Sequence, residues 1–413
     1  MSKPSIIICA SHSFKDPLFQ GLMFQYILNL QQIHSNSYSY HLITEEQKNY
    51  QCSIDEQRDI KIQLAEKNIH WHPQPYRGGR FILLKKLWHF IILFHTLRTI
   101  KRNENVKLII GFLAIASGYS YIISRLLKTK FMVFCFEPHS LYMKEFGIWS
   151  EHSLKYKLLH RIEKLQATRS DYVVGPTYHT IELLEKWKSK SKLFRVPISV
   201  DTEKFSFSPN KRQSIRSLLK IAEDRYVMMY LGKFGGIYYN EEQVAQFCRR
   251  LLQFDAAIYF LIISPNDPIQ IKITFEKQGI SKPDFSVLNT IPYDEIENYI
   301  SASDMGIVAI PPLHSQKFRT PVKVGNYLSC GLPFIINRGI ADDDIMAEEE
   351  NVGVVFESLE DENIDVPLKK LKALMSEDRK IQRDRCRKAA IKHRGIHNST
   401  SVLDQVIRAC YEN

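Results

Sequence analysis

The chain has 413 residues, which is too long for one hydrophobic core and predicts two domains of roughly 200 residues each. A hydrophobic fraction of 44% and a charged fraction of 24% describe an ordinary globular protein. The net charge of +11 indicates anionic partners, without distinguishing phosphorylated substrates, anionic lipids and nucleic acid. The 7 cysteines are scattered and contain no C-x-x-C pair, which argues against a disulfide framework or a zinc site.

No segment has the length or composition of a membrane anchor. The first apolar run, residues 5–9, is too short for the core of a signal peptide, and no stretch reaches the length of a membrane span. We therefore expect a cytoplasmic protein, with any membrane contact peripheral and at the inner face of the plasma membrane.

The first half of the chain predicts alternating strands and helices. Residues 5–10 are typical of a fully buried parallel strand, and a helical pattern through residues 19–30 separates them from a strand near residues 41–44. This order opens a doubly wound α/β domain. Later strands of the same half are expected at residues 107–112, 131–136 and 171–174.

A second α/β series begins after Val196 and Pro197, because Pro cannot donate to a continuing strand ladder. Its strands are expected at residues 226–231, 258–263, 285–288, 305–310, 334–336 and 353–356. The prediction is two Rossmann-like domains facing each other across a cleft, residues 1–197 and 198–395. Residues 396–413 are expected to form a last helix that packs back on the first domain. Ligands of such folds bind at the carboxyl ends of the strands.

A glycine-rich loop follows the first strand of the second domain. Gly232, Gly235 and Gly236 would let the backbone approach a phosphate, and Lys233 adds positive charge beside it. The alternative is a tight turn that needs positive φ and binds nothing.

About ninety residues later, residues 319–337 predict a second phosphate-directed element. Arg319, Pro321 and Lys323 precede or open a short helix that stops at Gly331. A helix start next to two cations directs N–H groups and positive charge at one point, which suits a diphosphate.

These segments resemble the motifs of family 4 (group 1) nucleotide-sugar glycosyltransferases. Residues 321–333 are similar to P-x-K-x-x-E-Y-L-x-x-G-L-P, and residues 230–239 to Y-x-G-x-x-G-G-W-Y. Residues 291–307 are similar to V-P-x-x-E-V-x-x-Y-x-x-A-A-D-I-G-I, whose first loop lies against the nucleotide base in that family. Residues 16–28 resemble the opening D-P-L-x-S-Q-V-x-x-Y-L of members that act in bacterial surface-polysaccharide pathways.

The resemblance implies a GT-B fold and a hexosyltransferase-type enzyme that moves a sugar from a nucleotide diphosphate with retention and without a metal or other cofactor. The acceptor would be a saccharide or a polyprenyl-linked molecule. The residues implied as catalytic are Lys233, Arg319, Lys323 and His139. Those implied for donor binding are Gly232, Gly235, Gly236, Pro292, Tyr293, Thr320 and Asn326. For the loop at Pro292, a simple strand-to-helix connection with Asp294 near an N-cap is the alternative.

The chain departs from the family at two positions. Many members have two Glu residues eight apart, and these map to Phe318 and Asn326. An amide oxygen can accept a ribose hydroxyl bond, but without charge assistance that bond is weaker. Recognition of the donor is therefore expected to depend on Lys233, Arg319 and Lys323.

The loop after residues 131–136 supplies the acceptor candidates. Polar side chains at the carboxyl end of a strand face the expected cleft, and those here are Glu137, His139, Ser140 and Tyr142. His139 would position the acceptor hydroxyl, because in retaining enzymes of this type the leaving phosphate can take the proton. The alternative is a structural loop capped by Glu137.

Residues 80–102 combine an apolar stripe with many basic residues. The stripe contains Leu83, Leu87, Phe90, Ile91, Phe94 and Leu97, and the basic residues include Arg80, Lys85, Lys86, Arg98, Lys101 and Arg102. Such a helix either lies on an anionic membrane or is a core helix with a solvated charged face. His70 and His72 lie on one face of an expected strand, a spacing that could bind metal but more often marks surface histidines.

Two other functions remain open on the sequence alone. One is a metal-dependent transferase that uses Asp342, Asp343 and Asp344 as a D-x-D site. The other is a non-catalytic or weakly active GT-B-like partner protein. Nucleic-acid binding is not expected, because the clearest basic cluster lies on an apolar helix and is not grouped with exposed aromatic residues.

Overall fold

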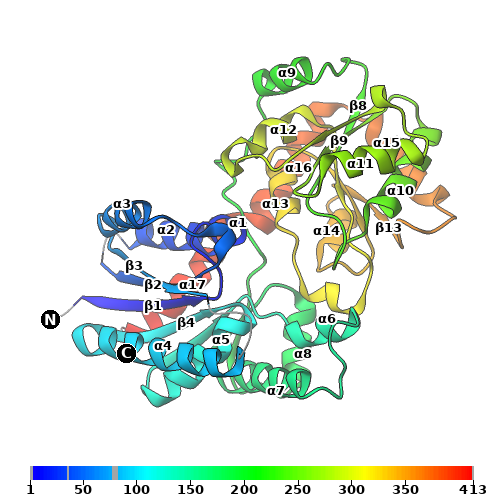
Figure 1. The fold of residues 1–413 in the computed structure, drawn as a ribbon. Helices are drawn as coiled ribbons and strands as arrows, with labels where there is room; N and C mark the ends of the chain where they lie inside the picture. Colours follow the sequence, from blue (N-terminus) through cyan, green and yellow to red (C-terminus); the bar gives the residue numbers. More distant parts are fainter. Residues whose placement is uncertain (1–2, 35–36, 77–81, 412–413) are drawn as a thin grey trace. The chain divides into compact units, whose positions relative to one another are not determined.

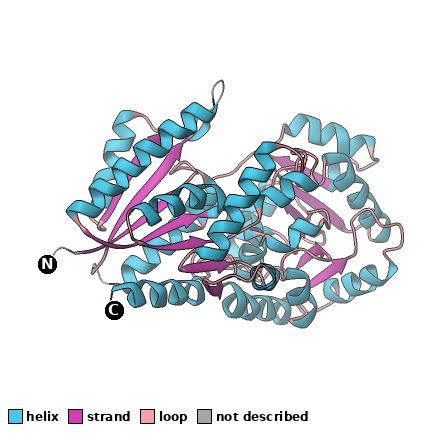
Figure 2. Cartoon of the chain, turned by 90° about the horizontal axis from the view of Figure 1, so that it is seen from below, coloured by secondary structure: helices cyan, strands magenta, loops and turns pink. Residues whose placement is uncertain are grey.

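A computed structural model describes residues 3–34, 37–76 and 82–411. The chain divides into two compact units (Figure 1). The N-terminal unit comprises Met1–Pro197 and Ile396–Asn413, and the C-terminal unit comprises Ile198–Gly395. Figure 2 shows that strands and helices occur in both units. Each unit is described by itself.

Within the described residues, the N-terminal unit is built on a 7-stranded parallel sheet with the order β3-β2-β1-β4-β5-β6-β7. The first strand in the chain, β1, thus lies in the interior of the sheet and is buried on both faces, which explains its unbroken apolar run. The strands are β1 (Pro4–Ala10), β2 (Ser39–Glu46), β3 (Ile69–Pro75), β4 (Asn105–Phe112), β5 (Lys130–Phe134), β6 (Tyr172–Gly175) and β7 (Lys192–Arg195).

The last helix of the chain belongs to the N-terminal unit, where it packs on α2 and β4. Its residue Tyr411 donates a hydrogen bond to the carbonyl of Ser5 at 2.5 Å, and Asp404 contacts His34 at 2.5 Å. The helices of this unit are α1 (Pro17–Gly21), α2 (Met23–Ile33), η1 (Lys48–Tyr50), α3 (Ile54–Ala65), α4 (Ile82–Asn103), α5 (Leu113–Leu126), α6 (His139–Glu145), α7 (Leu154–Arg169), α8 (Tyr178–Lys186) and α17 (Ile396–Tyr411).

The C-terminal unit contains a second parallel sheet, in which the described residues form 6 strands in the order β10-β9-β8-β11-β12-β13. The strands are β8 (Tyr226–Leu231), β9 (Ile258–Ile263), β10 (Phe285–Leu288), β11 (Met305–Val308), β12 (Phe334–Asn337) and β13 (Gly353–Phe356). The helices are α9 (Pro209–Leu218), α10 (Glu241–Phe254), α11 (Pro268–Lys277), η2 (Lys282–Asp284), η3 (Tyr293–Glu295), α12 (Ile296–Ala302), η4 (His314–Phe318), α13 (Val322–Ser329), α14 (Asp343–Glu349), α15 (Asp365–Met375) and α16 (Arg379–Arg394).

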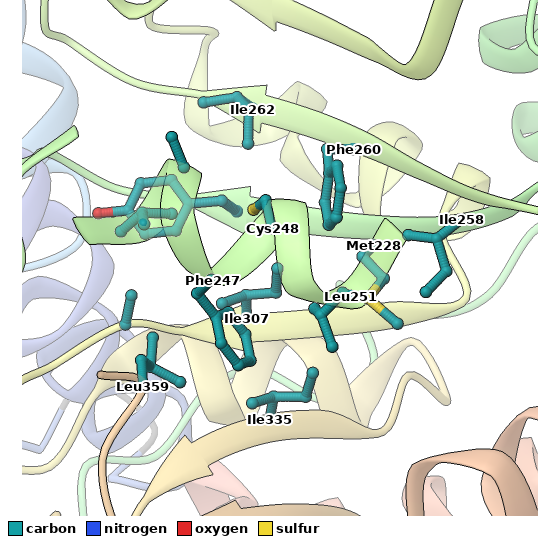
Figure 3. Close-up of a cluster of buried hydrophobic side chains, with 14 of the residues drawn as sticks. Met228, Phe247, Cys248, Leu251, Ile258, Phe260, Ile262, Ile307, Ile335 and Leu359 are labelled. Atoms are coloured by element: carbon teal, nitrogen blue, oxygen red, sulfur yellow. The ribbon is translucent and has the colours of Figure 1, made fainter. Parts of the chain in front are cut away.

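Helix α10 is held against the second sheet by a fully buried apolar face. Phe247, Cys248 and Leu251 pack with Met228 of β8 and Phe260 of β9 in one cluster (Figure 3). Burying one such large side chain contributes roughly 1.5–3 kcal/mol to folding. A capping box between Asn240 and Gln243 starts the helix. These contacts fix both ends of the loop that joins β8 to α10.

The predicted fold class, two α/β domains with parallel sheets, is confirmed. Some strand ends differ from the prediction. The strand expected to reach residue 136 ends at Phe134, because Cys135 adopts a φ of 59° that turns the chain out of the ladder. The backbone N–H of Phe136 then donates to Val174, which keeps the end of the segment attached to the sheet. The strand expected at 305–310 likewise ends early, at Val308.

Candidate functional site

The loop between β8 and α10 is left-handed at its glycines. The φ angles are 149° at Gly232, 77° at Gly235 and 65° at Gly236, a region that other residues rarely adopt. A Cβ added at Gly235 or Gly236 would meet nothing within 4 Å, whereas one at Gly232 would lie 2.8 Å from Nζ of Lys323. The loop is therefore a turn that needs glycine and an open surface with an ammonium group beside its first glycine.

Hydrogen bonds hold this loop in place. The hydroxyl of Tyr230 donates to the carbonyl of Lys233 at 2.7 Å, and the amide of Phe234 donates to Oδ1 of Asn266 at 3.0 Å. The amide of Gly235 donates to the carbonyl of Tyr239 at 2.9 Å. Among the described residues, no partner is found for the amide of Gly236. An amide left over in a fixed glycine loop is suited to an anionic oxygen.

Lys323 lies in the first turn of α13 and is the residue that connects the two predicted phosphate elements. Its Nζ lies 5.4 Å from the ring centre of Tyr230 and 5.7 Å from that of Tyr238. In the part of the chain that the structure describes, this ammonium makes no hydrogen bond or ion pair. Burial lowers the pKa of Lys323 to about 8. The site thus contains a half-buried cation that is stabilised only by aromatic rings.

The other predicted cations occupy the same neighbourhood to different degrees. Lys233 is exposed, and its Nζ lies 5.8 Å from the ring centre of Tyr238, the ring that Lys323 also approaches. Arg319 and Thr320 lie between η4 and α13, with Arg319 half-buried and Thr320 buried. The geometry therefore brings together Lys233 and Lys323 across Tyr238, and it places Arg319 on the segment that leads into α13.

Both positions that depart from the family motif are buried. Phe318 is 2% exposed and packs in η4, where its ring lies 6.0 Å from that of His314. Asn326 is 4% exposed on α13, one turn after Lys323, and its Oδ1 has no hydrogen-bond partner among the described residues. A buried carbonyl oxygen without a donor is costly, and a ligand hydroxyl would satisfy it.

The loop predicted to face a nucleotide base is partly packed. The ring of Tyr293 lies 5.5 Å from that of Phe205, and Nζ of Lys204 lies 4.8 Å from its centre. Burial raises the pKa of the Tyr293 hydroxyl to about 12. Pro292 beside it is exposed. The alternative role of Asp294 as a cap is not found, because neither η3 nor α12 has a side-chain N-cap hydrogen bond.

In the N-terminal unit, the predicted acceptor residues lie in and before α6. Ser140 is fully buried, and its amide and hydroxyl both donate to Glu163, at 3.0 and 2.5 Å. His139 and Tyr142 are half-buried and hydrogen-bonded to each other. Pro138, rather than Glu137, occupies the N-cap position. The loop is tied down by Ser140, while Glu137, His139 and Tyr142 remain partly accessible.

Glu163 is a residue that the sequence analysis did not single out. It is fully buried on α7, and burial raises the pKa of its carboxyl to about 7. Its hydrogen bonds to Ser140 cross from one helix to the next and hold the loop after β5. The only signal in the sequence is a lone Glu within a helix that is otherwise basic, and such a residue is usually a surface partner of nearby lysines.

The acidic and histidine clusters have structural partners. Asp343 is 2% exposed and paired with Arg394, and Asp344 accepts from the amide of Gly339 at 2.9 Å. His72 contacts His41 at 3.0 Å. Among the described residues, no group of three or more His, Cys, Asp or Glu side chains has a geometry that could hold a metal ion. The carboxylates of Asp343 and Asp344 are therefore engaged within the protein at the start of α14.

Helix α4 has two apolar faces where the sequence suggested one stripe. Leu93, Leu97 and Ile100 are buried against the sheet, with Phe90 and Phe94 partly buried beside them. A second set is exposed to solvent and consists of Leu84, Leu87, Trp88 and Ile91. The assignment of Leu87 and Ile91 to the same face as Leu97 is therefore wrong. Arg80 lies outside the described residues. No helix of the described chain is long and apolar enough to cross a bilayer.

Comparison with protein families gives a partial match. Residues 265–383 match the model of the C-terminal domain of glucosyltransferase 3-like proteins. The matched part contains Tyr293, Lys323 and Asn326 but not the glycine loop. No curated protein was found to match the chain in sequence.

Solved structures share the whole fold at low identity. Sucrose-phosphate synthase from Thermosynechococcus elongatus aligns with a TM-score of 0.72 and 12% identity, covering 99% of this chain and 99% of the other. HepE from Anabaena, solved in complex with UDP and glucose, aligns with a TM-score of 0.69 and 10% identity, covering 98% and 100%. A glycosyltransferase from Rickettsia africae aligns with a TM-score of 0.68 and 14% identity, covering 100% and 99%.

The fold is the GT-B fold of these glycosyltransferases. Taken with the matched glucosyltransferase 3-like domain, it supports a glycosyltransferase enzyme.

Proposed function

We propose that this protein is a retaining glycosyltransferase of family 4 type. It moves a sugar from a nucleotide diphosphate to a hydroxyl of a saccharide or lipid-linked acceptor in cell-surface polysaccharide biosynthesis. The C-terminal unit binds the donor, and the N-terminal unit binds the acceptor. HepE was solved with UDP-glucose, so UDP-glucose is the first donor to test.

The observation that carries the proposal is the unpartnered ammonium of Lys323 beside Gly232. A half-buried Lys with a pKa of about 8 is costly to the free protein unless a ligand provides the missing negative charge. A nucleotide diphosphate provides it, because its phosphates fit an open glycine loop. During transfer the leaving diphosphate gains negative charge, and a fixed cation stabilises that charge in the transition state.

The roles proposed for the other residues follow from the negative charge that develops on the leaving diphosphate. Lys233 and Arg319 add positive charge to the leaving diphosphate, and Asn326 accepts a ribose hydroxyl through its unpartnered oxygen. His139 positions the acceptor hydroxyl, and the leaving phosphate takes its proton. No metal is required, because the lysines and the loop amides take the role of a divalent ion.

Donor turnover tests the site directly. Lys323→Ala and Lys233→Ala should lose UDP-glucose hydrolysis and transfer, whereas Lys272→Ala, an exposed lysine on α11, should not. Activity in EDTA should equal activity without it, and NMR of the product should show the donor's anomeric configuration. Full activity of both loop and helix variants would refute the donor site, and loss of activity in EDTA would favour the aspartate run.

A peripheral membrane contact is proposed through the exposed face of α4. Leu84, Leu87, Trp88 and Ile91 recur at helical spacing, and Arg98 and Arg102 are exposed on the same helix. This surface would place the enzyme beside a lipid-linked acceptor at the inner face of the plasma membrane. Trp88→Ser should reduce sedimentation with anionic vesicles and Leu218→Ser, an exposed control in the C-terminal unit, should not.

A second function is favoured by one observation. Both positions of the usual Glu pair are non-acidic and buried, at Phe318 and Asn326, which suits a non-catalytic or weakly active partner protein. Thermal-shift measurements with UDP-, GDP- and ADP-linked sugars distinguish the two. A shift without turnover of any donor would support the non-catalytic partner.

A further inference from the structure

Four arginines gather around one carboxylate in the C-terminal unit, and three of them pair with it. Arg212 and Arg216 come from α9, Arg379 and Arg383 from α16, and the carboxylate is that of Asp304, just before β11. Asp304 accepts from Arg212 at 2.8 Å and from Arg216 at 2.6 Å, and it also pairs with Arg379. The four residues are separated by up to 171 positions in the chain, so only folding assembles them.

Two of these arginines have a structural role. Arg216 is 1% exposed and donates to the carbonyls of Ala302 and Arg225 at 3.0 and 3.2 Å. Arg212 donates to the carbonyls of residues 301–303, which end α12. Asp304 also accepts from the amide of Val227 at 2.9 Å. Arg212, Arg216 and Asp304 therefore stabilise the end of α12 and the start of β8, and they explain part of the cluster.

Arg383 has no such role. Among the described residues its guanidinium makes no hydrogen bond and no ion pair, and it lies 3.6 Å from the ring centre of Phe207. Burial, together with the nearby charges of Arg212 and Arg379, lowers the pKa of Arg383 to about 10. Arg379 bonds to Asp304 through one nitrogen and is 42% exposed. Most donors of these two guanidiniums are thus available to a ligand.

These two side chains line an open cavity of about 680 Å³. Its other lining residues are Phe207, Pro209, Arg212, Gln213 and Glu223. Four guanidiniums and the two carboxylates of Asp304 and Glu223 leave a net charge of two positive, which a phosphate dianion would neutralise. Asp378 is not among the lining residues, and its carboxylate caps α16 by accepting from the amides of Lys380 and Ile381.

The cavity is separate from the candidate donor site. Asp304 bonds to Val227 near the first residue of β8, whereas Gly232 follows the last residue of the same strand. A strand of this length spans roughly 17–20 Å. The two cationic sites therefore lie at opposite ends of one sheet.

We propose that the cavity beside Phe207 binds the phosphate group of a phosphorylated small molecule, held by the guanidiniums of Arg383 and Arg379. Arginine matches phosphate because its planar guanidinium group donates two parallel hydrogen bonds and is weakly hydrated. Two guanidinium groups that each donate two hydrogen bonds need three or four acceptor oxygens. A phosphate has that many, and a single carboxylate does not. The cavity has room for a hexose-sized group beyond the phosphate. This site does not depend on the function proposed for the glycine loop.

The test measures binding of inorganic phosphate and of glucose 6-phosphate by calorimetry with the full chain, at constant ionic strength. Arg383→Gln keeps the Cβ and Cγ positions that pack against Gly331 and removes the guanidinium. Lys388→Gln removes one charge from an exposed position of the same helix and is the matched control. Lys323→Ala removes binding at the donor site. Arg379→Gln is a second variant at an exposed position, so the test does not depend on the folding of one protein.

In the Lys323→Ala background, where the donor site no longer contributes, Arg383→Gln and Arg379→Gln should weaken phosphate binding at least tenfold, and Lys388→Gln should leave it within twofold. Tighter binding of glucose 6-phosphate than of phosphate supports a phosphorylated metabolite, and equal binding supports free phosphate as the natural occupant. The proposal is overturned if neither probe binds the wild type. It is also overturned if Lys323→Ala abolishes binding while Arg383→Gln retains it, because phosphate would then occupy only the donor site.

Discussion

Two loops at the carboxyl ends of parallel strands differ in how their polar groups are satisfied. After β8, the loop with Gly232 lies against Lys323, whose ammonium has no hydrogen-bond or ion-pair partner in the described chain. After β5, the loop that leads into α6 is tied by the amide and hydroxyl of Ser140 to the buried Glu163. Both were candidate ligand loops in the sequence.

The two loops differ in whether a ligand is needed to satisfy their polar groups. A folded protein tolerates an unpaired half-buried charge at a cost, and such a charge persists where a ligand completes it. A loop whose polar groups bond within the protein is already complete. The first arrangement is the reason for proposing a donor site there, and the second provides a rigid frame for His139 and Tyr142.

Lys323→Met should weaken UDP binding about 100-fold, the loss of about 2.7 kcal/mol of charge-assisted contact. The same change should stabilise the free protein by about 1–3 kcal/mol, because it replaces an unpaired half-buried ammonium by an apolar chain between two tyrosine rings. Calorimetry and urea unfolding measure the two effects. A destabilised variant that still binds UDP would contradict the assignment.

Glu163→Ala should destabilise the protein by about 2 kcal/mol, because it leaves the buried amide of Ser140 without its acceptor and the hydroxyl with only Nδ1 of His160 as a partner, at 3.1 Å. Glu163→Gln retains an acceptor and removes the charge. The raised pKa of about 7 means that ionisation costs the folded state stability as pH rises from the unfolded value of 4.5 to 7. The free energy of unfolding of Glu163→Gln, measured in urea, should therefore increase relative to that of wild type as the pH rises from 5 to 8. If the two proteins differ in stability by the same amount at pH 5 and at pH 8, Glu163 is ionised at both pH values and its pKa is not raised.

UDP affinity should fall as the pH rises above about 8. Lys323 is charged below this pH, and a bound diphosphate favours the charged form, so deprotonation weakens binding. The expected slope approaches tenfold per pH unit, or about 1.4 kcal/mol, above pH 8. Titrations from pH 7.5 to 9.5 measure it, and the slope should vanish in Lys323→Met. A flat profile in wild type would place the essential positive charge elsewhere.

Gly232→Ala should cost about 1 kcal/mol of stability and also weaken UDP binding, because the new Cβ lies 2.8 Å from Nζ of Lys323 and the backbone has a φ of 149°. Gly147→Ala is the comparison in the N-terminal unit. The φ of Gly147 is 68°, and a Cβ there would meet nothing within 4 Å. Gly147→Ala should therefore lower stability by a similar amount through backbone strain and leave the affinity for UDP unchanged. Equal UDP affinity in both variants would mean that the glycine loop does not contact UDP.

Several features could be read from the sequence because they depend on neighbours in the chain. Unbroken apolar runs such as residues 226–231 and 258–263 predicted parallel strands that are buried on both faces. Gly232, Gly235 and Gly236 predicted a turn with positive φ, and the structure has one. The short helix that stops at Gly331 was also predicted, because only glycine easily takes the left-handed conformation after a helix end.

Other features were out of reach because they depend on side chains far apart in the chain. Ser140 is withdrawn from the surface by Glu163, and Asp343 by Arg394, and neither partner has a sequence signal. The stripe of α4 was predicted as one face, but which apolar residues face the sheet depends on where the helix docks. No motif in the sequence marks the arginines of α9 and α16, and only the fold brings three of them to Asp304.

The fold class, the glycine loop and the short helix before Gly331 could be predicted from the sequence, since they arise from local backbone preferences and short motifs. Only the tertiary structure decided which charges are paired. Among the described residues it gives Lys323 no anion and places Arg383 over an aromatic ring, and it gives Asp343 and Glu163 partners. The physical reason is that the free energy of a charge depends on its burial and on the groups packed around it, and these are set by contacts between distant segments.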